Sequence, residues 1–305
     1  MKTLSFLNFV SVTNRRVIVR VKWKVIFGFL LPALVGLFLF KFYPIILAAK
    51  NSFYTSSFLS GTEKFVGWDN YRSLFSDGIF WNSLKVTLWF NILANPLQVG
   101  VAILIAVLVN QKVKGINFFR TIFYLPVAIS VPIAAVIWGI LLNPNQGFVN
   151  SFLSIFGLPA QPFLVDKTQA MFSIILIASW IGFSYWMIFI LAALQEIPVE
   201  LYEAARVDGA SKCQMFFRVT LPMLKRSIAF VTVGATTSNF LLFAPTYILT
   251  RGGPSGSTHL LMYEAYLSAF SYSDMGRSCA IMMLLLLMIL AIVVVEMRML
   301  RESDT

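Results

Sequence analysis

The chain has 305 residues, of which 58% are hydrophobic and only 12% are charged, and its formal net charge is +11. A water-soluble domain of this length carries about twice that fraction of charged residues, so the composition argues against one. The two cysteines, Cys213 and Cys279, match no metal-binding spacing, and we expect them on opposite sides of a membrane, where they cannot form a disulfide.

The apolar residues gather into long runs, each close to the roughly 20 residues that a helix needs to cross a bilayer. The runs are continuously apolar, whereas barrel strands would alternate. We therefore predict an all-α membrane protein with six transmembrane helices, at about 25–48, 84–109, 116–141, 171–194, 227–249 and 276–297. They form one transmembrane domain, 25–297, between an N-terminal segment, 1–24, and a short tail, 298–305.

The basic residues alternate between the two sets of loops. Sixteen of the 24 Lys and Arg lie in 1–24, in the loops after the second and fourth runs, and in the tail, whereas the other loops hold five. The positive-inside rule then places both termini in the cytoplasm, and the net charge indicates topology rather than nucleic-acid binding. The first apolar run is too long for the core of a cleaved signal peptide.

Charged residues in or beside the runs fit ordinary surface roles. Lys41, Lys85 and Arg277 fall near outer ends, where their side chains are expected to reach the interface. Asp77 lies in the first outer loop, where we expect solvation, and His259, the only histidine, is expected to be a loop residue. No carboxylate is expected at mid-depth, which argues against coupling to protons or sodium.

The longest loop predicted on the cytoplasmic side, 195–226, contains signals for two short helices. Pro198 suits a first helical turn, Gly209 suits the left-handed residue after a helix, and Ser211 suits the cap of a second helix that continues to Pro222. One face of the first helix is apolar and comprises Ile197, Leu201, Ala204 and Ala205. Such a helix either lies in lipid as a connector or inserts into a cytoplasmic partner.

The same loop carries a longer pattern: Glu203-Ala204-Ala205, then Gly209, then Val219-Thr220-Leu221-Pro222. This resembles the EAA motif of binding-protein-dependent ABC importer permeases, with Val219 in place of the usual isoleucine. Motifs over nearly the whole chain resemble the sugar-permease subset, the maltose and glycerol-phosphate group, among them Gly67-Trp68-Asp69-Asn70-Tyr71 and Leu249-Thr250-Arg251-Gly252-Gly253-Pro254.

The resemblance implies a type I ABC importer permease fold. It implies that the loop holds a coupling helix whose ATPase contacts are Glu203, Ala204, Ala205, Asp208 and Gly209. The implied partners are a second permease subunit of a different sequence, two cytoplasmic ATPase subunits and an extracytoplasmic solute-binding protein. The implied cargo is a carbohydrate or related polyol, and the implied location is a bacterial-type inner membrane.

Other function classes find less support. The sequence contains no Gly-x-x-x-x-Gly-Lys loop, so we expect it not to bind ATP in that way and expect ATP hydrolysis on separate subunits. We also expect no other cofactor, no metal site and no catalytic residue in this chain. A membrane enzyme would need more than a lone histidine. A secondary transporter or channel not coupled to ATP would explain six helices, but not the motif around Glu203.

Polar and aromatic residues within the runs are candidates for a solute path, because sugar rings favour aromatic faces beside amides and hydroxyls. Our candidates for that path are Tyr185, Asn239 and Phe243. The alternative is that such residues hold helices together, as Asn91, Asn95 and Gln98 on the second helix also could.

Overall fold

The computed structural model describes residues 23–56 and 63–302, so the predicted N-terminal segment 1–24 lies almost wholly outside the described residues. The chain forms two compact units, Met1–Leu47 and Ala48–Thr305. The described part of the first unit contains α1 (Trp23–Leu37), η1 (Phe38–Phe42) and the start of α2 (Tyr43–Asn51). The stretch Phe27–Asn51 is long and apolar enough to span a membrane, and none of its most apolar window is buried.

A widened turn precedes a proline in two places. In η1, Tyr43 N donates to Phe38 O, and in η4 (Phe216–Thr220), Leu221 N donates to Phe216 O. The next residues, Pro44 and Pro222, have no N–H and would clash with the carbonyl four residues back. The π-type turn moves the helix past this clash without ending it.

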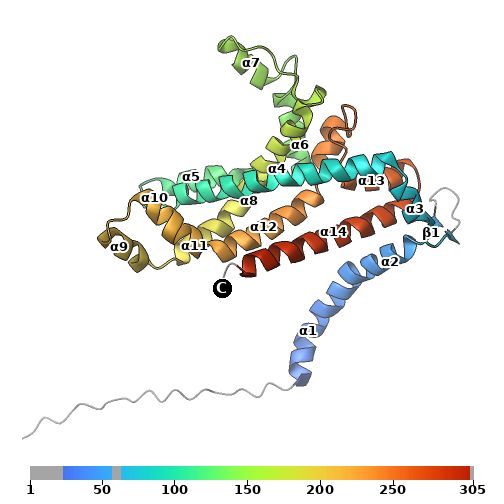
Figure 1. Cartoon of the computed structure of the whole chain (residues 1–305), viewed down its shortest axis with the longest axis horizontal. Helices are drawn as coiled ribbons and strands as arrows, with labels where there is room; N and C mark the ends of the chain where they lie inside the picture. The colour runs from blue at the N-terminus through green and yellow to red at the C-terminus, as the bar shows by residue number, and fades with distance from the viewer. Residues whose placement is uncertain (1–22, 57–62, 303–305) are drawn as a thin grey trace, which may run out of the picture. The chain divides into compact units, whose positions relative to one another are not determined.

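The second unit is built on four helices that pack together: α4 (Gly78–Val109), α8 (Gln169–Glu196), α12 (Lys225–Phe240) and α14 (Met275–Glu302) (Figure 1). The shorter elements are β1 (Tyr54–Ser56), β2 (Glu63–Phe65), α3 (Asp69–Phe75), α5 (Ile116–Tyr124), η2 (Leu125–Ala128), α6 (Val131–Leu141), α7 (Phe148–Ile155), η3 (Phe163–Val165), α9 (Val199–Val207), α10 (Lys212–Met215), η4, α11 (Leu221–Met223), η5 (Thr246–Thr250), α13 (Leu261–Tyr266) and η6 (Leu267–Ser271). The two strands form an antiparallel hairpin with Tyr54 opposite Phe65.

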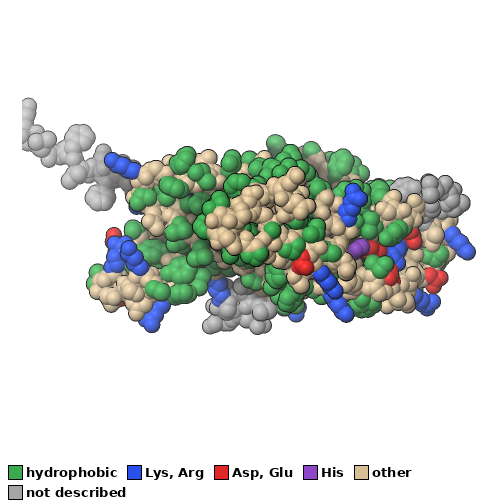
Figure 2. All heavy atoms as spheres, turned by 90° about the horizontal axis from the view of Figure 1, so that it is seen from above, with side chains coloured by type: hydrophobic (Ala, Val, Ile, Leu, Met, Phe, Trp, Pro, Cys, Tyr) green, Lys and Arg blue, Asp and Glu red, His purple; other side chains and the backbone are tan. Residues whose placement is uncertain are grey.

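The face of the molecule in Figure 2 is mainly covered by hydrophobic side chains, and most charged side chains on it gather toward its ends. Four helices of the described chain are long and apolar enough to cross a membrane: Phe27–Asn51, Gly78–Val109, Gln169–Glu196 and Met275–Arg298. A fifth span results if the bent pair Ile116–Ala128 and Val131–Leu141 is counted as one. The membrane class of the prediction is therefore confirmed.

Two of the predicted runs are interrupted. The run 116–141 bends by 101° between η2 and α6, because Ile129 and Ser130 are extended and a new helix begins at Val131, with Pro132 in its first turn. The run 227–249 is a helix only as far as Phe240, and η5 follows after Pro245. Neither run is the single continuous helix that its composition predicts.

Small residues allow close packing in the helical core. An added Cβ at Gly234 would lie 2.4 Å from the Trp186 indole, and one at Gly182 would lie 2.7 Å from the Gln98 side chain. Small residues at helix contacts in membranes let neighbouring elements approach in this way. Trp186 consequently joins the core cluster formed by α4, α8 and α12.

A network of ion pairs joins α4, α13 and α14. Arg277 donates through Nη2 to Asp77 and, at 3.0 Å, to Glu264, whose other oxygen lies 2.9 Å from His259 Nε2. Glu264 is 0% exposed. Two carboxylates therefore pair with Arg277, whose side chain is 17% exposed, and its position at the interface stays a prediction.

Asp77 differs from the prediction of simple solvation. Its carboxylate caps α4 by accepting from Ile79 N at 2.8 Å and binds Arg277. Partial burial disfavours the charged form, but the Ile79 amide and the Arg277 guanidinium outweigh it, so the pKa of Asp77 lies below its usual value. The stabilisation is present above the usual carboxyl pKa and is lost as pH falls through the lowered value.

Gly276 permits the contact between the β1 strand and α14. A Cβ there would lie 2.0 Å from Tyr54 O, a backbone atom, and 3.0 Å from Asn70 Nδ2, which itself holds Tyr54 O at 3.1 Å. We expect Gly276→Ala to destabilise the fold by about 1–3 kcal/mol in SDS-induced unfolding, the usual range for overpacking. The matched control is Gly100→Ala, where an added Cβ meets nothing within 4 Å; equal stability of the two variants would contradict this account.

Candidate functional site

The helix α9 carries the motif of the predicted coupling loop. Pro198 precedes it in an extended conformation, Glu200 lies in its first turn and Arg206 in its last, which is the favourable order of charges for the helix dipole. Glu203, Ala204 and Asp208 are exposed. The apolar face predicted for this helix is partly uncovered by its own chain: Leu201 is 40% exposed and Ala204 is exposed, whereas Ile197 packs against the core cluster.

Gly209 ends α9 as predicted, in the left-handed region with φ of 78°. Gly209 N donates to Arg206 O at 3.0 Å, and Ala210 N donates to Ala205 O at 2.9 Å. These two bonds define a Schellman motif, which satisfies the last carbonyls of the helix and reverses the chain sharply. The direction in which α9 projects is thus fixed by the backbone.

The following segment holds α9 from the other side. Ser211 and Gln214 form the predicted cap of α10 as a reciprocal capping box. The hydroxyls of Tyr202 and Thr220 lie 3.0 Å apart, and Thr220 is 6% exposed, so α9 is tied to η4. Hydrogen bonds therefore tie the loop together on both sides of the turn at Gly209, and the loop exposes four of its five predicted contact residues, Ala205 being half-buried.

The structure brings together two of the three candidates for the solute path. Tyr185 on α8 and Asn239 on α12 line one cavity of about 190 Å³, together with Gln98, Gly182 and Trp186. Tyr185 is 44% exposed, whereas Asn239 is 4% exposed. An open aromatic face beside a buried amide is the combination expected for a polar ring.

Phe243 does not line that cavity. Its ring stacks on Tyr247 at 5.1 Å and lies 4.7 Å from the ring of Tyr266, within an aromatic cluster that also includes Tyr263. The structure therefore separates Phe243 from the other two candidates.

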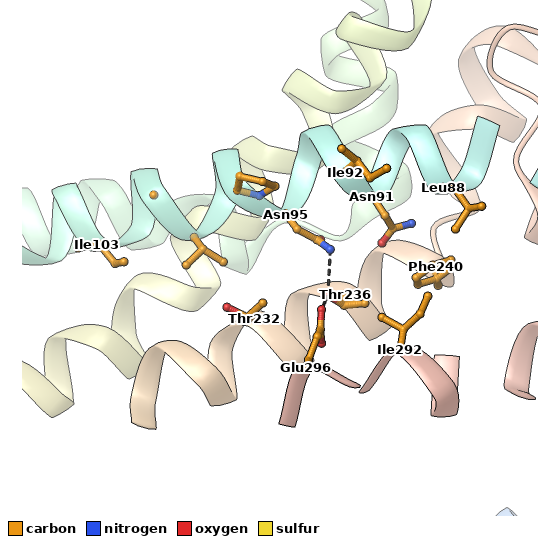
Figure 3. A pocket seen from close by; sticks show the side chains of 13 residues that line it. Leu88, Asn91, Ile92, Asn95, Ile103, Thr232, Thr236, Phe240, Ile292 and Glu296 are labelled. Carbon is orange, nitrogen blue, oxygen red and sulfur yellow. Dashed lines mark hydrogen bonds between the residues drawn. The ribbon is translucent and has the colours of Figure 1, made fainter. Parts of the chain in front are cut away.

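A second cavity of about 570 Å³ lies between α4, α12 and α14, and Figure 3 shows the side chains that line it. Its polar lining includes Asn91, Asn95, Thr236 and Glu296. Glu296 accepts from Thr236 Oγ1 at 2.8 Å, and its Oε2 is buried without a hydrogen-bond partner among the described residues. Glu296 was not identified from the sequence, because it falls near the end of a run and its partner lies 60 residues away.

Comparison with known proteins identifies the class. Residues 98–300 match the family model described as binding-protein-dependent transport system inner membrane component. The chain is 38% identical over 257 residues to the probable ABC transporter permease protein YurN of Bacillus subtilis, with 83% of this chain and 88% of that protein covered. It is 32% identical over 250 residues to the sn-glycerol-3-phosphate transport system permease protein UgpA of Agrobacterium fabrum, covering 82% and 85%.

Solved structures agree. A chain of a bacterial alginate ABC transporter, crystallised with an alginate pentasaccharide-bound periplasmic protein, superposes with a TM-score of 0.80 at 26% identity, covering 92% of this chain and 95% of that one. The chain belongs to the family of inner membrane components of binding-protein-dependent transport systems. It is a multi-pass permease subunit of an ABC importer with the type I permease fold, and ATP hydrolysis belongs to separate subunits.

Proposed function

We propose that this chain forms, with a second permease subunit of different sequence, the path through which a carbohydrate or related polyol enters the cell. An extracytoplasmic binding protein delivers the solute, and two cytoplasmic ATPases drive the transport cycle. The cargo is supported by the relatives, which include a permease for sn-glycerol 3-phosphate and an alginate importer. The observation that carries the proposal is the loop around α9, which leaves Leu201 and four of the five predicted contact residues exposed.

The proposed topology has six spans and cytoplasmic termini. The bent pair in 116–141 provides the third span, and α12 with η5 provides the fifth as a broken helix. Broken helices within a membrane are tolerated where the freed backbone groups are buried in protein or line a cavity. The basic residues of the 195–226 loop support its place on the same side as the termini.

In the proposed coupling contact, α9 docks into a cleft of an ATPase subunit. Ala204 and Ala205 permit close approach, Glu203 and Asp208 offer acceptors to basic groups, and Gly209 makes the turn. Because the Schellman motif and the Tyr202–Thr220 contact hold α9 firmly, movement of the ATPase is transmitted to η4 and α12. The two permeases then alternate between inward- and outward-facing states.

The proposed solute path uses the Tyr185 ring for stacking and Asn239 for hydrogen bonding, with Phe243 and its aromatic neighbours as a separate surface along it. In vesicles containing this chain with its second permease, ATPases and binding protein, we expect ATP-dependent uptake of at least one of maltose, sn-glycerol 3-phosphate and alginate pentasaccharide. Tyr185→Ala should reduce uptake at low solute concentration by about tenfold, the loss of a good aromatic contact.

The matched control is Tyr124→Ala, because Tyr124 is 43% exposed and Tyr185 is 44% exposed, yet Tyr124 does not line the cavity. Asn239→Ala tests the second residue in the same assay. Equal uptake by the native chain, Tyr185→Ala and Asn239→Ala would refute the path. An absence of ATP-dependent uptake of all three solutes would refute the proposed cargo.

A further inference from the structure

Five polar side chains form a continuous relay through the helical core. Asn95 Nδ2 donates to Thr236 Oγ1 at 2.9 Å, and Thr236 Oγ1 donates to Glu296 Oε1 at 2.8 Å. On the other side, Asn239 Nδ2 donates to Asn95 Oδ1, and Asn239 and Gln98 exchange two amide bonds of 3.2 Å. The relay crosses from α14 through α12 and α4 and connects the cavity of Figure 3 with the cavity that contains Tyr185.

Glu296 is the one member of the relay that gives it a direction. Asn, Gln and Thr side chains each donate and accept, so the other four could reverse every bond together and still be satisfied. A carboxylate only accepts, so the single hydrogen of Thr236 points to Glu296. Thr236 then accepts from the amide nitrogen of Asn95, which turns Asn95 Oδ1 toward Asn239.

This direction determines what Asn239 offers to the cavity. Both hydrogens of Asn239 Nδ2 are used, one on Asn95 and one on Gln98. Its Oδ1 accepts one bond from Gln98 and retains a second lone pair. The hydrogen-bonding capacity that remains on Asn239 is therefore that of an acceptor, and reversal of the relay would convert it into that of a donor.

We propose that Glu296 is a positioning residue for solute recognition, which fixes the relay so that Asn239 presents an acceptor to a solute hydroxyl. The proposal rests on the proposed function, because it takes Asn239 as part of the solute path. It identifies the recognised feature as a hydrogen-bond donor on the solute, which a sugar or polyol hydroxyl supplies. A carboxylate oxygen that is buried without a hydrogen-bond partner, as Glu296 Oε2 is among the described residues, is costly, and setting the direction of the relay gives Glu296 a role.

Glu296→Gln should remove this control, because an amide satisfies Thr236 in either direction. If both hydrogen-bond directions of the relay are similarly populated, only about half of the molecules present the acceptor on Asn239. The KM for uptake then rises by about twofold or more, and the maximal rate stays unchanged. The matched control is Glu63→Gln, the same chemical change on the exposed strand β2. The probes are maltose, sn-glycerol 3-phosphate and alginate pentasaccharide.

A second readout needs no solute: the thermal midpoint of the purified importer complex. Asn239→Asp places an acceptor-only group against Asn95 Oδ1, and we expect the midpoint to fall by roughly 4–8 °C. In a chain that already carries Glu296→Gln, the relay can reverse. Asn239→Asp should then lower the midpoint by at most half as much. Thr236→Val breaks the relay, so in that background the effect of Asn239→Asp on the midpoint should no longer depend on Glu296. Direct repulsion between the carboxylate introduced at position 239 and Glu296 would persist in that background.

The outcomes separate the two proposals. If Asn239→Ala impairs uptake but Glu296→Gln resembles the native chain in KM and leaves the cost of Asn239→Asp unchanged, the solute path stands and the relay is overturned. If Glu296→Gln reduces the fall in midpoint caused by Asn239→Asp, and Thr236→Val removes this dependence, the relay stands. If Asn239→Ala then leaves uptake unchanged, the proposed path is wrong and the role of Glu296 in recognition falls with it.

Discussion

Replacing Glu203 by Arg together with Gly209 by Pro is expected to abolish co-purification of the ATPase while leaving the permease in the membrane. Proline locks φ near −65°, whereas Gly209 has φ of 78°, and proline removes the N–H that donates to Arg206 O. The Schellman motif cannot form, so α9 loses its fixed direction. Charge reversal at the exposed Glu203 adds repulsion to a basic partner surface, and together we expect at least a tenfold loss of bound ATPase, or about 1.4 kcal/mol.

The matched control combines Glu63→Arg with Gly115→Pro. Gly115 also has a positive φ, of 83°, and like Gly209 it has open space where a side chain would project. Glu63 is exposed on β2, away from the loop. Retention of the ATPase by the control and its loss from the test variant, at equal membrane insertion, would support α9 as the coupling helix. Equal ATPase binding by both variants would contradict it.

The coupling loop was predictable because its signals are local. Pro198, Gly209 and Ser211 act through backbone conformation and caps within a few residues, and the Gly209 turn and the Ser211 cap are found in the structure. The same holds for the cores of α4, α8 and α14, whose length and apolar composition alone require a membrane or a large core. Family resemblance was needed to interpret the exposed residues of α9 as a contact with an ATPase, and to expect the type I permease fold, the partners and the cargo.

Breaks in the spans were harder to predict. Proline in a membrane helix produces several outcomes, from a widened turn at Pro44 to the 101° bend near Pro132. Which of them occurs depends on the neighbouring helices that take up the freed carbonyls, and composition does not contain this information. The end of α12 at Phe240 is a further example of such a break.

Pairings across the core could not be predicted at all. Asn95 and Gln98 each bind a residue 141 positions away, and Arg277 binds Asp77, 200 positions away. Each residue by itself has an ordinary surface or helix-contact interpretation. Only the fold shows that Glu264 is a buried carboxylate, that Glu296 accepts from Thr236, and that Arg277 pairs with Asp77 and Glu264.

Removing the charge of Arg277 is expected to be the most destabilising substitution proposed for this chain. In Arg277→Met, Glu264 loses its 3.0 Å partner at a position that is 0% exposed, and only His259 remains against it. Asp77 loses the same guanidinium. Removal of one partner from a buried ion pair typically costs about 3–5 kcal/mol, because the other charge stays desolvated.

The measurement is SDS-induced unfolding of the chain in mixed micelles, with Arg72→Met as the control. Arg72 pairs with Asp69 at 3.4 Å, but its side chain is 80% exposed, so its loss should cost less than about 1 kcal/mol. Glu264→Gln should restore much of the stability lost in Arg277→Met, because a neutral amide needs no buried counter-charge. If Arg277→Met is no more destabilising than Arg72→Met, or if Glu264→Gln makes it worse, the buried ion pair does not hold α13 to α14, and packing alone joins them.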